Sequence, residues 1–309
     1  MGVGSGFGKV ILFNEHFVVY GIPAIASAIG LRTTAHVVPS EMPGIVIEDN
    51  RLETPGYKIG KLEHQQDSLR RMLAFMKINP EEHKYKIVLG GDLVAASGVG
   101  ASAASCTAIA RALSDELGLG LSDEQINEVA YEGEKGYHGT PSGIDNTAST
   151  FGGLIWFKKG EKNIIERLQI SKPIEIVMGN TGIVANTKAA VAGVKERKEK
   201  EPEKYARIFQ EAESLVYKAR DALKKYDLRE VGALMNKNHE LLQQIEVSCD
   251  ELDTLVSIAR ENGALGAKMT GGGLGGYMVA LTPGKELQDK VADAIEAQGF
   301  TTLRTTIGV

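Results

Sequence analysis

The chain has 309 residues, a mass of 33.2 kDa, 43% hydrophobic residues and a formal net charge of −5 at pH 7. This length allows two domains that share an interface, or one large α/β domain. The acidic balance lacks the basic footprint of nucleic-acid binding, so no nucleic-acid partner is expected. No apolar run is long enough to cross a membrane and the N-terminus lacks a signal core, which favours a cytoplasmic protein with no membrane partner. Cys106 and Cys249 are expected to be reduced thiols.

In chain order, the first part of the sequence predicts strands separated by amphipathic helices. GVGSGFG (2–8) is interpreted as a flexible lead-in to the buried strand KVILF (9–13), and residues 40–65 are expected to form turns. Apolar periodicity and a capping box of Ser122 with Gln125 predict three helices, at 62–76, 98–118 and 122–134. A short helix is expected to begin at Asn146, after the loop that carries Asp145.

After roughly residue 170 the composition shifts towards charged helical segments. We therefore expect one domain at 1–170 and a second at 171–309. In the second domain, strands are predicted at 173–180, 267–270, 277–282 and 300–308, and helices at 188–226 (with a break near Pro202), 228–248, 250–262 and 284–298.

One acid, Asp145, lies in the Gly- and Pro-rich stretch HGTPSGIDNTAS (138–149). A carboxylate held by a rigid turn near a lysine and a phosphate loop is suited to accept a proton from an alcohol. Lys9 is the candidate lysine, which would stabilise the developing negative charge. Glu134, at a predicted helix end, is a candidate Mg²⁺ ligand. Taken singly, Lys9 also fits an ordinary strand-end lysine, and Glu134 an ordinary helix-surface acid.

Two glycine-rich stretches are candidate ligand loops. GVGASAAS (98–105) stands between a strand-like segment and a helix, an arrangement that suits a phosphate, although a small-residue helix packed on a sheet explains it equally well. Ser102 offers a hydroxyl there for phosphate or metal. KMTGGGLGG (268–276) has five glycines in six positions, more than a hairpin turn needs, which favours close approach to a ligand over a merely flexible loop.

Together these stretches resemble the three ordered motifs of the galactokinase, homoserine kinase, mevalonate kinase and phosphomevalonate kinase (GHMP) superfamily. The motifs are GKVILFNEHFVVYG (8–21), GVGASAAS and KMTGGGLGG. GEKGYHGTPSGIDNTASTFGG (133–153) and NTGIVANTKAAVAGVKER (180–197) are most similar to mevalonate kinases. The resemblance implies an α+β fold with two domains. The N-terminal domain would be like domain 2 of ribosomal protein S5, and the C-terminal domain would be ferredoxin-like.

The resemblance also implies an activity and residue roles. The activity is ATP- and Mg²⁺-dependent transfer of the γ-phosphoryl group to the C5 hydroxyl of mevalonate, giving 5-phosphomevalonate in isoprenoid biosynthesis. The implied residues are Asp145 and Lys9 for catalysis, Gly98, Val99, Gly100, Ala101, Ser102 and Ala103 for ATP, Ser102 and Glu134 for the metal, and Glu15, His16, Thr187, Gly271, Gly272 and Gly273 for the substrate. The resemblance also favours a homodimer.

The sequence departs from the family pattern at two places. Asn14 stands where motif one usually has glycine. Motif two usually begins with proline-glycine and contains two paired serines. Here the segment around Ser97 lacks the proline-glycine lead, and Ala101 replaces the first of the paired serines. A sister kinase acting on phosphomevalonate or homoserine stays open as an alternative, although a phosphorylated acceptor would require more cations than Lys9 and Arg32. A non-catalytic ligand sensor is the alternative of another class.

Overall fold

The computed structural model describes residues 1–96, 98–161, 163–185 and 187–309. The chain forms two compact units, the first from residues 1–9 and 28–152 and the second from residues 10–27 and 153–309. Strands β1 (Val3–Phe13) and β2 (Ala24–Pro39) pair with each other, and both run through both units. The long strands therefore carry residues of the two units on one continuous backbone.

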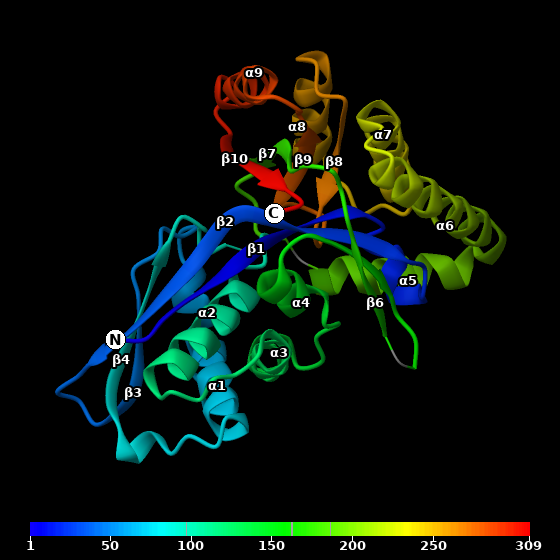
Figure 1. The fold of residues 1–309 in the computed structure, drawn as a ribbon. Helices are drawn as coiled ribbons and strands as arrows, with labels where there is room; N and C mark the ends of the chain where they lie inside the picture. The colour runs from blue at the N-terminus through cyan, green and yellow to red at the C-terminus, as the bar shows by residue number, and fades with distance from the viewer. Residues whose placement is uncertain (97, 162, 186) are drawn as a thin grey trace. The chain divides into compact units, whose positions relative to one another are not determined.

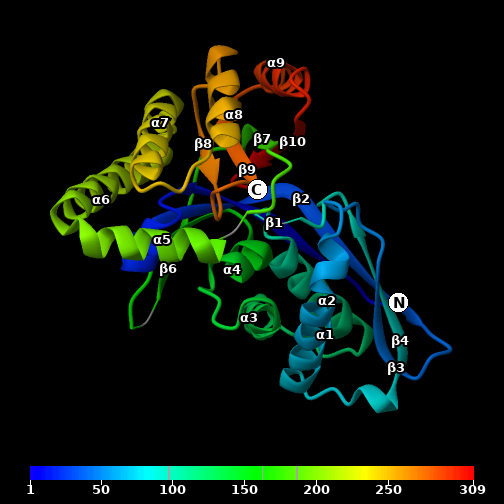
Figure 2. The ribbon, with the colours of Figure 1, turned by 180° about the vertical axis from the view of Figure 1, so that it is seen from behind.

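In unit 1 a sheet is covered by helices. Strand β2 pairs antiparallel with β4 (Lys84–Gly91), which pairs parallel with β3 (Gly44–Asp49). The α-helices of unit 1 are α1 (Tyr57–Phe75), α2 (Ala101–Glu116), α3 (Asp123–His138) and α4 (Ile144–Phe151), and Figures 1 and 2 show them grouped beside these strands. Buried aliphatic side chains such as Ile87, Met72 and Leu113 form the core between the sheet and the helices.

Three of the glycines of residues 2–8, Gly4, Gly6 and Gly8, form part of β1 and Gly2 comes just before it, so the flexible lead-in predicted there is wrong. A Cβ on Gly2, Gly4 or Gly6 would overlap the backbone carbonyl of Ala112, Ala108 or Ala104 in α2. These three glycines alternate in sequence up to and along the start of β1, and the three alanines recur every fourth residue along the helix. This small-residue pairing lets β1 lie directly on α2, at a distance that a larger side chain would prevent.

Two further expectations for unit 1 need correction. The segment 40–65 is not only turns, because it contains β3, and α1 begins at Tyr57, before the apolar periodicity starts. The capping box of Ser122 and Gln125 is confirmed, with both reciprocal hydrogen bonds present, and α3 continues to His138. Short 3-10 helices occur at η1 (Phe17–Tyr20) and η2 (Pro80–Glu82).

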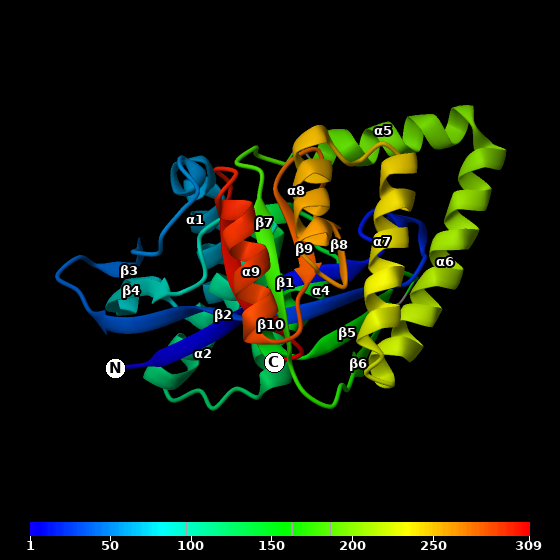
Figure 3. The ribbon, with the colours of Figure 1, turned by 90° about the horizontal axis from the view of Figure 1, so that it is seen from above.

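In unit 2, four antiparallel strands confirm the ferredoxin-like prediction. They are β7 (Ile174–Asn180), β8 (Gly266–Thr270), β9 (Tyr277–Leu281) and β10 (Thr301–Ile307), and their spatial order is β10–β7–β9–β8. Helices α8 (Asp250–Glu261) and α9 (Lys285–Glu296) pack on this sheet, as Figure 3 shows. With one helical connection before β8 and another before β10, the unit has the βαββαβ order of ferredoxin-like domains.

Three more helices of unit 2 follow one another in sequence: α5 (Thr187–Lys200), α6 (Pro202–Lys224) and α7 (Leu228–Gln244). Pro202 occupies the first turn of α6, where its missing N–H is harmless, which explains the predicted break. Helices α6 and α7 lie side by side in Figure 3, and α7 contacts β8. A hairpin of β5 (Leu154–Lys158) and β6 (Ile164–Leu168) completes the unit. Among the described residues, no helix has both the length and the apolarity to cross a bilayer.

Candidate active site

Lys9 and Asp145 form an ion pair in unit 1. The Lys9 Nζ lies 3.0 Å from the Asp145 Oδ1, and the Lys9 side chain is almost fully buried whereas the carboxylate is one-third exposed. Asp145 lies in the first turn of α4, not in the preceding loop as expected, because the helix begins directly after Gly143, whose φ is +91°. The partial positive charge of a helix N-terminus favours a carboxylate at this position.

The glycine loop of residues 98–103 leads into α2 beside Lys9. The backbone N–H of Lys9 donates to the Val99 carbonyl over 2.8 Å, which ties β1 to this loop. Gly100 is the N-cap of α2 with a φ of +72°, and no described side chain caps the helix. Ala101, Ser102 and Ala103 form the first turn, whose N–H groups suit an anion. Ser97 lies outside the described residues.

Glu134 is a buried acid next to the ion pair. Its side chain is 2% exposed, and burial raises its pKa to about 8, with the Asp145 charge acting in the same direction and a hydrogen bond from Ser102 and the Lys9 charge opposing. Its Oε1 has no hydrogen-bond partner among the described residues. The carboxyl group is therefore poised to lose its proton when a positive charge comes near.

His138 belongs to the same cluster, although it was not among the predicted site residues. Its Nε2 lies 3.4 Å from the Ser102 Oγ and 3.7 Å from the Glu134 Oε2. Burial lowers the pKa of His138, partly opposed by the charge of Asp145. The spacing of four residues between Glu134 and His138 places both on one face of a helix and was the available signal.

A magnesium ion needs few protein ligands when phosphate and water supply the others. Nowhere in the described ranges do three or more His, Cys, Asp or Glu side chains gather as a metal site. Ser102 and Glu134 nevertheless fit a phosphate-held ion, because a hydroxyl and a buried carboxylate oxygen without a described partner lie together at the first turn of α2.

A second cluster, in unit 2, is built around Glu15. The Lys268 Nζ forms a completely buried ion pair with the Glu15 Oε1 and also donates to the Met269 carbonyl over 2.6 Å. Burial lowers the pKa of Lys268, and the attraction of Glu15 opposes this shift. Lys268 was not among the predicted site residues, although it is the one charged residue in the apolar strand AKMT.

His16 and Thr187 both contact Gly272. The His16 Nε2 lies 3.0 Å from the Gly272 carbonyl, and burial lowers the pKa of His16 to about 4, so the ring is neutral at pH 7. Because Nε2 donates to a carbonyl, Nδ1 is an acceptor, and this buried atom has no partner in the part of the chain that the structure describes. A Cβ on Gly272 would overlap the Thr187 Oγ1, so only glycine fits.

The remaining predicted residues lie in the same two groups. Gly271 and Gly273 flank Gly272 with φ values of +82° and +73°. Unit 1 thus brings together Lys9, Asp145, Ser102, Glu134 and the glycine loop, and unit 2 brings together Glu15, His16, Thr187 and the glycines of 271–273. Within the similar segment 180–197, residue 186 lies outside the described residues.

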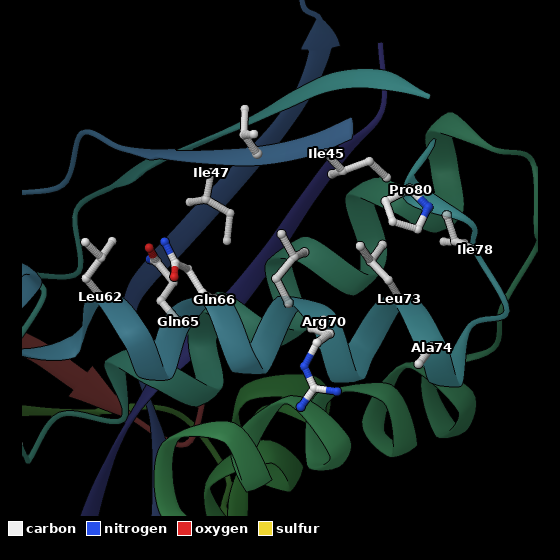
Figure 4. Close-up of a pocket in the computed structure, with 12 residues that line it drawn as sticks. Ile45, Ile47, Leu62, Gln65, Gln66, Arg70, Leu73, Ala74, Ile78 and Pro80 are labelled. Atoms are coloured by element: carbon white, nitrogen blue, oxygen red, sulfur yellow. The ribbon is translucent and has the colours of Figure 1, made fainter. Parts of the chain in front are cut away.

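An apolar cavity of about 510 Å³ in unit 1 contains none of these residues. Figure 4 shows it between α1 and β3, with the amides of Gln65 and Gln66 near one end. Its other lining includes Ile45, Ile47, Leu62, Leu69, Leu73 and Ile78. Because the only polar side chains in its described lining are Gln65, Gln66 and Arg70, this cavity is a poorer candidate for reaction chemistry than the polar clusters.

Comparison with known proteins identifies the family of this chain. The family descriptions "GHMP kinases N terminal domain" and "GHMP kinases C terminal" match residues 67–153 and 219–300. The mevalonate kinase of Pyrococcus abyssi is 38% identical over 97% of this chain and 93% of that protein. The crystal structure of L. major mevalonate kinase in complex with R-mevalonate is 40% identical, with a TM-score of 0.95 over 99% of this chain and 96% of that one. The Methanococcus jannaschii mevalonate kinase structure is 25% identical, with a TM-score of 0.84 over 99% of this chain and 98% of that one.

The chain therefore belongs to the GHMP kinase family, and within it to the mevalonate kinases.

Proposed function

We propose that this protein transfers the γ-phosphoryl group of ATP to the C5 hydroxyl of mevalonate, giving 5-phosphomevalonate and ADP. The observation that carries the proposal is the Lys9–Asp145 ion pair, 3.0 Å long, beside a glycine loop at a helix N-terminus. Full-length similarity to the kinase whose structure holds R-mevalonate supports mevalonate as the acceptor.

Asp145 and Lys9 carry the reaction in this proposal. The Asp145 carboxylate accepts the proton of the C5 hydroxyl as the oxygen–phosphorus bond forms and the bond to the leaving ADP breaks. Lys9 holds the carboxylate in place and stabilises negative charge that develops on the reacting oxygens. Much of the rate comes from the fixed positions of these groups, because they require little rearrangement during the reaction.

The phosphates of ATP bind at the loop of residues 98–103. The uncapped first turn of α2 offers N–H groups and the positive end of the helix dipole. Ser102 and Glu134 would hold the magnesium ion, which supplies positive charge against the phosphate oxygens when it is bound. The Glu134 oxygen without a partner supports this role, since a buried carboxylate requires a compensating charge.

Glu15, His16, Thr187 and Gly271–Gly273 bind mevalonate in this proposal. The neutral His16 offers an acceptor nitrogen to a hydroxyl group of the substrate. The same proposal includes the domain limits 1–170 and 171–309, a cytoplasmic location and a homodimer. These rest on the sequence and on the family resemblance alone.

The test is turnover of Mg²⁺-ATP with mevalonate, 5-phosphomevalonate, homoserine and galactose in separate reactions, with products identified by phosphorus NMR. A 5-phosphomonoester formed from mevalonate alone is the expected result. If only another acceptor is phosphorylated, the protein is a kinase with a substrate other than mevalonate. ATP binding without turnover of any acceptor would favour a ligand sensor and overturn the proposed function.

A further inference from the structure

Asn14, at the end of β1, is buried in an unusual backbone conformation in unit 2. Its φ is +69°, in the left-handed region that asparagine tolerates better than most residues. Its side-chain Nδ2 donates to the carbonyls of Pro23, over 2.8 Å, and Ala212, over 3.1 Å. The glycine that motif one usually has would allow the same backbone but could make neither of these bonds.

Asn14 is also paired reciprocally with Asn238 of α7. The Asn14 backbone N–H donates to the Asn238 Oδ1 over 3.2 Å, and the Asn238 Nδ2 donates to the Asn14 Oδ1 over 3.1 Å. Both side chains are completely buried. Because the pair is reciprocal, removing either side chain leaves buried polar groups of the other without their partner.

His239, the next residue of α7, holds a second segment. Its Nδ1 accepts a hydrogen bond from the Met269 N–H over 3.3 Å, and its Nε2 lies 3.1 Å from the Asp253 Oδ1. Burial lowers the pKa of His239 to about 4, which keeps Nδ1 an acceptor at neutral pH. Asp253 accepts hydrogen bonds from Ser248 and Gln243, so the carboxylate that lies beside the ring is itself fixed.

The two segments held in this way carry the substrate-side residues. Asn14 directly precedes Glu15 and His16, and Met269 directly follows Lys268, the ion-pair partner of Glu15. Consecutive residues on a helix point about 100° apart, so Asn238 and His239 can reach two different segments from one turn. A buried ion pair is stable only with accurate geometry, which requires both of its backbones to be fixed.

We propose that Asn14, Asn238 and His239 are positioning residues for mevalonate: α7 holds the backbones on both sides of the Glu15–Lys268 ion pair and so fixes the orientation of Glu15 and His16. The inference rests on the proposed function, because it takes Glu15 and His16 as the residues that bind mevalonate. The inference assigns Asn14, Asn238 and His239 no role in ATP binding.

The experiment compares Asn14→Gly, Asn238→Ala and His239→Leu with wild type in steady-state kinetics and in calorimetric binding of mevalonate without ATP. Each variant should raise KM and Kd for mevalonate about tenfold, with the KM for ATP within about twofold of wild type. The effect of Asn14→Gly combined with Asn238→Ala should be smaller than the product of the two single effects, since each variant breaks the same reciprocal pair, although Asn14→Gly also loses the bonds to Pro23 and Ala212. Lys237→Ala is the matched control, because this exposed neighbour on α7 makes surface ion pairs with Glu211 and Glu240 and should change neither constant.

His239→Gln, which keeps an acceptor and a donor, should recover part of the mevalonate affinity that His239→Leu loses. This variant also keeps the proposal testable if Asn14→Gly does not fold. If the wild-type protein phosphorylates mevalonate and the folded variants have unchanged KM and Kd for mevalonate, the positioning role is wrong while the proposed function stands. A wild-type protein that does not phosphorylate mevalonate would instead overturn the proposed function, and this inference with it.

Discussion

Glu134→Gln should remove a pH dependence of stability from the ligand-free protein. The folded-state pKa of Glu134, about 8, lies above its ordinary value of 4.5 because the carboxyl group is buried beside Asp145. The folded state therefore holds a proton that the unfolded state has lost, and this contribution to stability is lost as pH rises towards 8 and above. From pH 6 to pH 9 the loss comes to roughly 2 to 3 kcal/mol of the free energy of unfolding.

The assay is denaturant unfolding of both proteins in EDTA at several pH values. Other groups titrate over the same range, so the informative quantity is the wild-type curve minus the Glu134→Gln curve. That difference should fall with rising pH, and parallel curves would refute the buried, protonated state of Glu134. In the kinase assay the same variant should raise the Mg²⁺ concentration required for half-maximal rate, whereas an unchanged Mg²⁺ titration would count against the ligand role.

Three further substitutions test other parts of the structure. Asp145→Asn should abolish turnover and leave ATP binding within about twofold of wild type, since only the proton acceptor is lost; near-normal turnover would remove Asp145 from the reaction centre. Lys9→Met should lower kcat by about a hundredfold or more, and a rate close to wild type would contradict its role. Gly4→Val should lower the free energy of unfolding by about 1 to 3 kcal/mol, because its side chain overlaps α2; an unchanged denaturation midpoint would show that β1 can move away from the helix.

The sequence predicts most helices and strands because their apolar residues form patterns that match the buried positions in the structure. Helix α8 and strand β9 are examples. The sequence predicts the start of β1 wrongly because glycine is read as a breaker when considered alone. The signal for the packing of β1 on α2 is a pair of patterns. Glycines alternate at positions 2, 4 and 6, and alanines recur every fourth residue at 104, 108 and 112. Neither pattern indicates packing without the other, and they are far apart in sequence.

The site shows the same limit. Asp145, Glu134 and the glycine loops are recognisable because each belongs to a local motif. Lys268 and Asn238 have no such signal, since their importance comes from partners more than two hundred residues away in sequence, Glu15 and Asn14. Asn14 itself is visible as a departure from a glycine pattern, but only the structure shows that its side chain makes hydrogen bonds to α6 and α7.

The balance of charge around Lys9 connects the stability prediction with the chemistry. With Glu134 protonated, the cluster contains one cation, Lys9, and one carboxylate, Asp145, which form the ion pair. Loss of the Glu134 proton leaves two carboxylates against one lysine in a buried setting, and this excess negative charge disfavours the ionised cluster. A divalent cation bound with the phosphates of ATP would neutralise that excess, so its binding should release a proton from Glu134 near neutral pH.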